Sequence, residues 1–203
     1  MKIRITPGAA LLLLALFLEK NSFFLASLLA AAVHECGHLL AARWQKLPVY
    51  LLELDVVGAR LWTRGQLPSY RAETLLAAAG PFFSVLLALP LLPLSSSFAL
   101  ELRTATLSLA LFTRLPVSGF DGGRILYSML ARFFDEASAA SVLGVSSYLT
   151  LFTLFALSSC LLLRYGHSIT LAVLTASLFT RQFLSPQQPP LPKRRKTSIQ
   201  EFF

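Results

Sequence analysis

Long apolar segments constrain this chain more than any other feature, and they run over residues 7–18, 21–43, 70–93, 98–115, 139–163 and 167–183. A helix needs about 20 apolar residues to cross the hydrocarbon core of a bilayer. Only 14% of the 203 residues are charged and the mean hydropathy is +0.65, whereas about 25% of the residues of an ordinary soluble domain are charged. The segments therefore predict an all-α polytopic membrane protein with about six transmembrane helices.

The stretches between the apolar segments predict smaller elements. Residues 48–65 are rich in β-branched and aromatic residues, which is typical of strands, and predict a small membrane-associated β-hairpin between the second and third transmembrane helices. Residues 122–134 predict a short amphipathic helix at the membrane interface. We expect one membrane domain over residues 1–184, followed by a basic and disordered tail over residues 185–203.

The distribution of positive charge predicts the orientation in the membrane. If six spans follow a cytoplasmic N-terminus, all but three of the 18 Lys and Arg residues fall on the cytoplasmic side, the exceptions being Lys20, Arg103 and Arg164. Positive residues collect on that side of membrane proteins, so both termini are expected in the cytoplasm. The basic residues flank apolar segments instead of forming one amphipathic face, which argues against nucleic acid as a partner despite the net charge of +8.

An ionisable cluster, His34-Glu35-Cys36-Gly37-His38, interrupts the second apolar segment. Histidines four residues apart share one helix face, so both imidazoles can bind one metal ion while Glu35 acts as general base toward a water. A carboxylate within a membrane costs about 2.5 kcal/mol or more and usually marks function. Zinc suits such ligands. Cys36 points away from the histidines and is expected to be a packing residue, and Gly37 is expected to allow close helix packing.

Asp121 is the expected third metal ligand, since a catalytic zinc normally has three protein ligands. Other acidic residues fall in loops, in the hairpin, in the tail or near span ends, whereas Asp121 follows the fourth apolar segment and returns to the depth of the histidines. Gly122 and Gly123 are expected to allow a tight turn and a close approach of the backbone to a ligand. The alternative is that Asp121 is the N-cap of the helix over residues 122–134.

Three motifs occur together in the order and spacing typical of one family: HECGH, then AAGPFFS at residues 78–84, then LFTRLPVSGFDGGRIL at residues 111–126. Over residues 7–183 the chain resembles the site-2 protease family of intramembrane zinc metalloproteases. The compact form, without a recognisable PDZ or CBS module, is most similar to the stage IV sporulation protein FB branch of spore-forming bacteria.

The resemblance implies that His34, His38 and Asp121 bind one Zn²⁺ ion and that Glu35 activates the attacking water. Substrates would be membrane-spanning or membrane-associated proteins, which the strands of the hairpin would pair with in extended form. The sporulation branch implies a sigma-factor precursor as substrate, a bacterial cell membrane as location and an active site that opens to the cytoplasm. A regulatory membrane protein is also an expected partner, because an intramembrane protease needs restraint.

Two positions depart from the family pattern. Family members commonly carry Asn at the positions of Ser84 and Thr113, where it is thought to hold the substrate backbone or the oxyanion. Ser and Thr donate one proton instead of two, and loss of one oxyanion donor costs about 10²-fold or more in rate. Ser84 and Thr113 are therefore the expected substrate-binding residues, and their identity keeps open a weak or inactive protease that binds membrane proteins. A metal transporter is a further alternative, disfavoured because the sequence offers one cluster and no chain of polar residues across the membrane.

Overall fold

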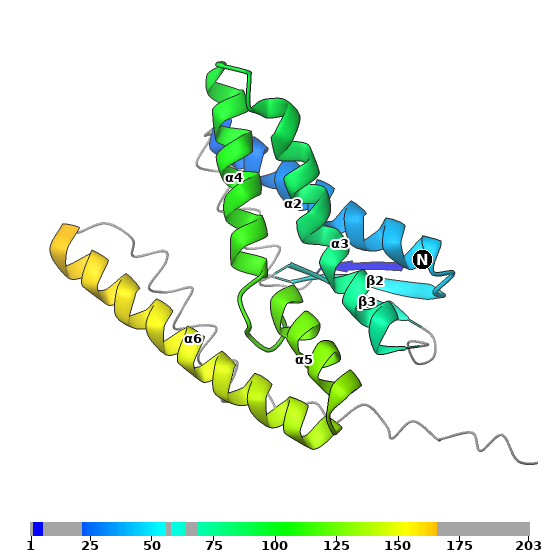
Figure 1. The fold of residues 1–203 in the computed structure, drawn as a ribbon. Coiled ribbons are helices and arrows are strands. Elements are labelled where there is room, and N and C mark those ends of the chain that lie inside the picture. Colours follow the sequence, from blue (N-terminus) through cyan, green and yellow to red (C-terminus); the bar gives the residue numbers. More distant parts are fainter. Residues whose placement is uncertain (1, 6–21, 56–57, 64–68, 166–203) are drawn as a thin grey trace, which may run out of the picture.

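The structure, a computed structural model, describes residues 2–5, 22–55, 58–63 and 69–165. In these ranges the chain forms five α-helices, a short 3-10 helix and three strands (Figure 1). In chain order they are β1 (Lys2–Ile5), α2 (Ser22–Trp44), β2 (Val49–Asp55), β3 (Gly58–Thr63), α3 (Tyr70–Ala88), η1 (Leu89–Leu91), α4 (Ser97–Thr113), α5 (Asp121–Phe133) and α6 (Glu136–Tyr165).

Three of the described helical segments are long and apolar enough to cross a membrane, namely α2, the continuous segment Tyr70–Leu91, and Glu136–Cys160 of α6. Helix α4 coincides with the predicted span 98–115 but has only 17 residues, fewer than the roughly 20 of a straight crossing. The described residues thus contain three candidates for the six predicted spans. Three predicted segments lie outside the described residues: 7–18, 167–183 and 185–203.

The strands form one sheet in the order β1-β2-β3. Strands β2 and β3 are antiparallel, with Glu53 opposite Arg60, and both lie within the segment 48–65. Strand β1 is not predicted by the sequence analysis, and it pairs with β2 in parallel, with Lys2 beside Leu51. Because β1 and β2 are neighbours, residues 2–5 and 49–55 lie on the same side of any membrane that α2 crosses.

Hydroxyl and carboxylate side chains define where several helices begin. The Oγ of Ser69 accepts a hydrogen bond from the N–H of Ala72 at 3.1 Å and caps α3, and Ser96 caps α4 through the N–H of Ala99 at 3.2 Å. Such caps satisfy backbone donors that have no partner in the first helical turn.

Small residues form the contact between α2 and α3. Ala30 of α2 and Ala77 of α3 are both buried, and a Cβ at Gly37 would lie 2.7 Å from the carbonyl oxygen of Ala79. The prediction that Gly37 allows close packing is confirmed. Cys36 is exposed on the helix surface, so the expectation that it is a packing residue is wrong.

Many large apolar side chains lie on the outside of the helices. Phe82 of α3 is 60% exposed and Leu149 of α6 is 64% exposed. Lipid solvates large apolar groups as well as a protein interior does, so helices in membranes associate through small residues that let their backbones approach closely. The distribution of side-chain sizes agrees with the membrane location predicted from the apolar segments.

Helix α5 is the predicted amphipathic helix, and it begins at Asp121, one residue before the predicted range. It packs against both α3 and α6 (Figure 1). Its contact with α3 is partly polar: the hydroxyls of Thr74 and Ser128 are 2.7 Å apart, and the Nε of Arg124 lies 3.8 Å from the Oε1 of Glu73. Hydrogen bonds, and not apolar packing alone, therefore dock α5 onto α3.

The loop over residues 114–120 carries the chain from α4 into α5 and is fastened to α6. The hydroxyl of Ser146 donates to the carbonyl of Pro116 at 3.0 Å, and the backbone N–H of Ser118 donates to the Oγ of Ser147 at 2.9 Å. An apolar cluster supports the same contact: Val117, Phe120 and Leu151. Helix α6 thus positions the residues that immediately precede Asp121.

Candidate metal centre

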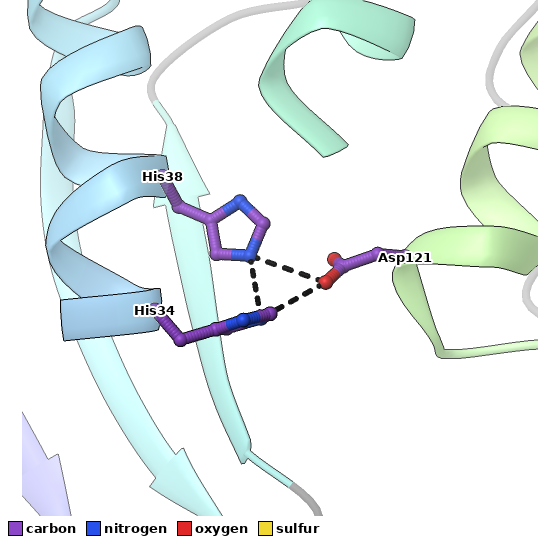
Figure 2. A group of neighbouring side chains, drawn as sticks. All are labelled: His34, His38 and Asp121. Carbon is purple, nitrogen blue, oxygen red and sulfur yellow. Dashed lines mark hydrogen bonds and ion pairs between the residues drawn. The ribbon is translucent and has the colours of Figure 1, made fainter. Parts of the chain in front are cut away.

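Three side chains that are far apart in the sequence meet at one point between α2 and α5. The Oδ2 of Asp121 lies 3.1 Å from the Nε2 of His34 and 3.3 Å from the Nε2 of His38, and the two Nε2 atoms are 3.2 Å apart. Figure 2 shows both imidazoles projecting from α2 toward the carboxylate at the start of α5. The structure therefore brings together the three residues that the sequence predicts as metal ligands.

The spacing of these atoms fits a small divalent metal ion. Bonds of about 2.0–2.1 Å at tetrahedral angles, as zinc makes, place neighbouring ligand atoms about 3.3 Å apart. The three observed separations, between 3.1 and 3.3 Å, are close to that value. All three side chains are largely buried, so His34, His38 and Asp121 could hold a metal ion with little rearrangement.

Helix α3 supplies a partner for the other nitrogen of each imidazole. The Nδ1 of His38 lies 2.8 Å from the carbonyl oxygen of Leu76, and the Nδ1 of His34 lies 3.0 Å from the Oγ of Ser84. A carbonyl can only accept, so the Nδ1 of His38 carries a proton, and in the neutral ring the Nε2 then has the lone pair that a metal ion needs. Such contacts to the second ring nitrogen orient histidines that bind metals.

Gly80 leaves free the space beside the ligating nitrogens. A Cβ at this position would lie 2.2 Å from the Nε2 of His38 and 2.7 Å from the Nε2 of His34. Both distances are too short for a contact with a carbon atom, and only the first is close to the Zn–N bond of about 2.0–2.1 Å. A glycine in the middle of α3 thus provides the room that the predicted metal ion requires.

Asp121 is the first residue of α5, whose N-cap is Phe120 without a side-chain hydrogen bond. The alternative that Asp121 is the N-cap is therefore wrong, and its carboxylate is directed to the histidines. Burial raises the pKa of Asp121, but the hydrogen bonds and charges of His34 and His38 outweigh this and lower the pKa to about 2. The positive end of the α5 dipole also favours a carboxylate here. Asp121 is consequently an anion over the whole physiological range.

The glycines after Asp121 act differently from the expectation. Gly122 and Gly123 lie inside the first turn of α5, where a Cβ would come within 1.9 Å of the carbonyl oxygen of Arg114 and 2.1 Å of that of Val117. They permit close contact with the preceding loop of the protein itself, and the expected approach to a ligand stays a prediction. The turn is made by Gly119, whose φ of +92° favours glycine.

Glu35 follows His34 on α2 and is half-buried. The predicted general base therefore lies beside the group that could hold the metal, although it is not one of its three ligands.

The two expected substrate-binding residues have hydroxyls engaged inside the protein. Ser84 is fully buried and contacts His34, as described above. The hydroxyl of Thr113, the last residue of α4, donates to the carbonyl of Leu109 at 3.0 Å. A substrate-binding role for Ser84 and Thr113 stays a prediction.

The sequence analysis missed the contributions of Gly80 and Leu76. Gly80 belongs to the AAGPFFS motif that contributes to the family resemblance, so the motif contained a signal to which no role was given. Leu76 acts through its backbone carbonyl, and a backbone atom leaves no signal in residue type.

Comparison with protein-family models finds no match, and comparison with curated proteins finds none either. Among solved structures, the chain is similar to the site-2 protease from Methanocaldococcus jannaschii, with 19% sequence identity and a TM-score of 0.63. The match covers 89% of this chain and 88% of that chain. At this identity the likeness concerns the arrangement of helices and strands, and this chain has the fold of a site-2 protease.

Proposed function

We propose that this protein is an intramembrane zinc metalloendopeptidase that cuts membrane-embedded or membrane-tethered proteins. The observation that carries the proposal is the triangle formed by the Nε2 atoms of His34 and His38 and the Oδ2 of Asp121. Its edges match tetrahedral zinc coordination, and it is built on a site-2 protease fold. Two neutral imidazoles and one carboxylate suit zinc, which performs no redox chemistry of its own.

The roles of the residues follow from their positions. His34, His38 and Asp121 would hold the ion, and a zinc ion held there would polarise the peptide carbonyl and acidify a water. Glu35, next to His34 on α2, would take the proton of the attacking water and deliver it to the leaving amine. Burial of the ligands keeps bulk water away and strengthens these electrostatic interactions.

The substrate we propose is a protein segment that leaves its helical form near the membrane surface. The strand order β1-β2-β3 leaves β1 and β3 at the edges of the sheet, and an edge strand can pair with an extended peptide through main-chain hydrogen bonds. The first candidate is the membrane-associated precursor of a sporulation sigma factor. A regulatory membrane protein would be a second partner.

We propose a multi-pass location in a bacterial cell membrane, with both termini and the opening of the site on the cytoplasmic side. The parallel pairing of β1 with β2 supports this topology, because it requires residues 2–5 and 49–55 to lie on the same side. Both segments fall on the cytoplasmic side in the arrangement that the positive charges favour.

The decisive test compares the wild type with Glu35→Gln in reconstituted vesicles that contain a membrane-tethered precursor. The substitution preserves the size of the side chain but removes the base, so we expect no cleavage while one zinc ion per chain remains bound. A chelator should stop the wild-type enzyme, and added zinc should restore it. Cleavage that continues both in Glu35→Gln and in the presence of chelator would remove the protease proposal.

A binding protein that does not cut is the second candidate function. The observation that favours it is that the hydroxyls of Ser84 and Thr113, at positions where Asn is common in the resembled family, contact His34 and Leu109. This candidate predicts that the wild type binds zinc and the tethered precursor but leaves it intact. A cellular phenotype that Glu35→Gln retains would support it over the protease.

A further inference from the structure

Ser84 stands behind one of the proposed metal ligands. It lies on α3, one turn after Gly80, and it is 0% exposed. Its Oγ is 3.0 Å from the Nδ1 of His34, on the opposite side of the ring from the Nε2 that meets Asp121. The hydroxyl of Ser84 therefore contacts the ring nitrogen of His34 that does not face Asp121.

The two histidines are supported unequally. His38 donates its Nδ1 proton to the carbonyl of Leu76, which cannot donate in return. The hydroxyl of Ser84 can either accept a proton from the Nδ1 of His34 or donate one to it. Only the first arrangement leaves the Nε2 of His34 with a lone pair for a metal ion, so the fitness of His34 as a ligand depends on this one side chain.

We propose that Ser84 is a positioning residue for the metal centre. Its Oγ accepts a hydrogen bond from the Nδ1–H of His34 and thereby directs the Nε2 of His34 toward the ion. The inference rests on the proposed metal site but not on peptidase activity. In this inference Ser84 contacts the metal ligand His34, whereas the sequence led us to expect a contact with the substrate. Partners of this kind typically change metal affinity by about 10-fold to 100-fold when they are removed.

The test measures metal binding to the full-length protein in detergent. Ser84→Ala removes the hydroxyl without adding volume, so the fold should be retained and can be checked by circular dichroism. Zinc affinity, measured in competition with a chromophoric chelator, should fall by about 10-fold to 100-fold. The visible absorption of the Co²⁺-substituted protein should change because His34 is less well oriented. Ser84→Thr keeps the hydroxyl and should remain within about 3-fold of the wild type.

Thr106→Val is the matched control, because Thr106 is also 0% exposed and its hydroxyl donates only to the carbonyl of Leu102 within α4. This variant should bind zinc as the wild type does. Equal zinc affinity and equal Co²⁺ spectra for Ser84→Ala and wild type would overturn the inference. If such a variant also had a raised KM for the tethered precursor, Ser84 would be a substrate-binding residue after all.

The result separates this inference from the proposed function. If the wild type binds zinc, Ser84→Ala weakens binding and no precursor is cut, the positioning role stands and the protease proposal falls. If the wild type binds no zinc or Co²⁺, both fall together.

Discussion

The two halves of the metal centre are assembled in different ways. The histidine half, α2 against α3, is a contact between small residues, in which Gly37 and Gly80 leave space that any Cβ would fill. The aspartate half, α5 with its preceding loop, is held by hydroxyls: Ser128 meets Thr74 of α3, and Ser147 of α6 accepts from the backbone of Ser118. Added volume at Gly37 or Gly80 should therefore damage the histidine half, and loss of the hydroxyl contacts should loosen the aspartate half, whose Gly122 and Gly123 tolerate a Cβ no better.

The difference also concerns how the ligands are delivered. His34 and His38 are four residues apart on one helix, so their spacing is set locally once α2 forms. Asp121 reaches them only if the loop over 114–120 and α5 are correctly placed by other helices. The relative placement of His34 and His38 thus requires only that α2 is formed, whereas the contribution of Asp121 to metal binding also requires the correct tertiary structure.

The largest effect is expected for Gly80→Ala. The added Cβ would lie 2.2 Å from the Nε2 of His38, so the imidazole must move away and zinc affinity should fall by more than about 100-fold. Elemental analysis of the purified variant should find almost no zinc. Gly144→Ala is the control, because its Cβ would meet nothing within 4 Å, and it should bind metal normally. Full zinc occupancy in Gly80→Ala would show that the space left by Gly80 is not needed for metal binding.

The second largest effect is expected from acidification, which should lower zinc affinity through the histidine half before it affects the aspartate half. Protons compete with the metal for the imidazoles, so zinc affinity should fall on acidification, by up to about 100-fold per pH unit where both imidazoles are protonated. The lowered pKa of Asp121, about 2, means that its charge persists far below that range and is lost only as the pH falls toward 2. Zinc titrations between pH 4 and 8 should show a two-proton dependence. Release of one proton near pH 4, where an ordinary Asp titrates, would instead make the aspartate half the limiting one.

A smaller effect is expected for Ser147→Ala. The change leaves the N–H of Ser118 without its partner at 2.9 Å, and the loss of one such hydrogen bond costs about 0.5–1.5 kcal/mol. The loop before Asp121 should loosen, so we expect zinc affinity to fall about 10-fold and hydrogen exchange over residues 114–120 to accelerate. Ser141→Ala, which removes an exposed hydroxyl bonded within α6, should do neither. Unchanged exchange in the loop would show that α6 does not hold it.

The smallest effect is expected at the contact between α3 and α5. Thr74→Val and Ser128→Ala each remove one side of a 2.7 Å hydrogen bond, and a double-mutant cycle on the free energy of unfolding should give a coupling of about 0.5–1.5 kcal/mol. Pairing Thr74→Val with Thr104→Val, an exposed hydroxyl bonded within α4, should give additive changes. A coupling near zero for Thr74 and Ser128 would show that this hydrogen bond does not contribute to the attachment of α5.

Local patterns predicted the features that depend on local geometry. The helix carrying His34 and His38 and the amphipathic helix after Asp121 follow from residue spacing, and so does the direction of Cys36 away from the histidines. The choice of Asp121 as third ligand came from excluding the other acidic residues and from the family resemblance, and the structure brings it to the histidines.

Features that depend on contacts between distant segments were not predicted. Strand β1 exists because it has β2 as a neighbour, and four residues at one end of the chain contain too little pattern to indicate a strand. The contact of Ser84 with His34 needs the register of α3 against α2, which sequence alone does not give. Gly122 and Gly123 were predicted to form a turn and to approach a ligand, because glycine indicates a close approach but not the group that is approached. The groups approached are two backbone carbonyls of the loop.

The attachment of the 114–120 loop to α6 bears on when the protein becomes reactive during its synthesis. The helix that fastens this loop is translated after every residue of the His-His-Asp cluster, so a nascent chain halted before Ser147 would carry the histidine pair without a settled aspartate. Ribosome-bound and partly inserted forms of the proposed peptidase would then be inert toward neighbouring membrane proteins. The activity that we propose would arise only once α6 has emerged from the insertion machinery and packed into place.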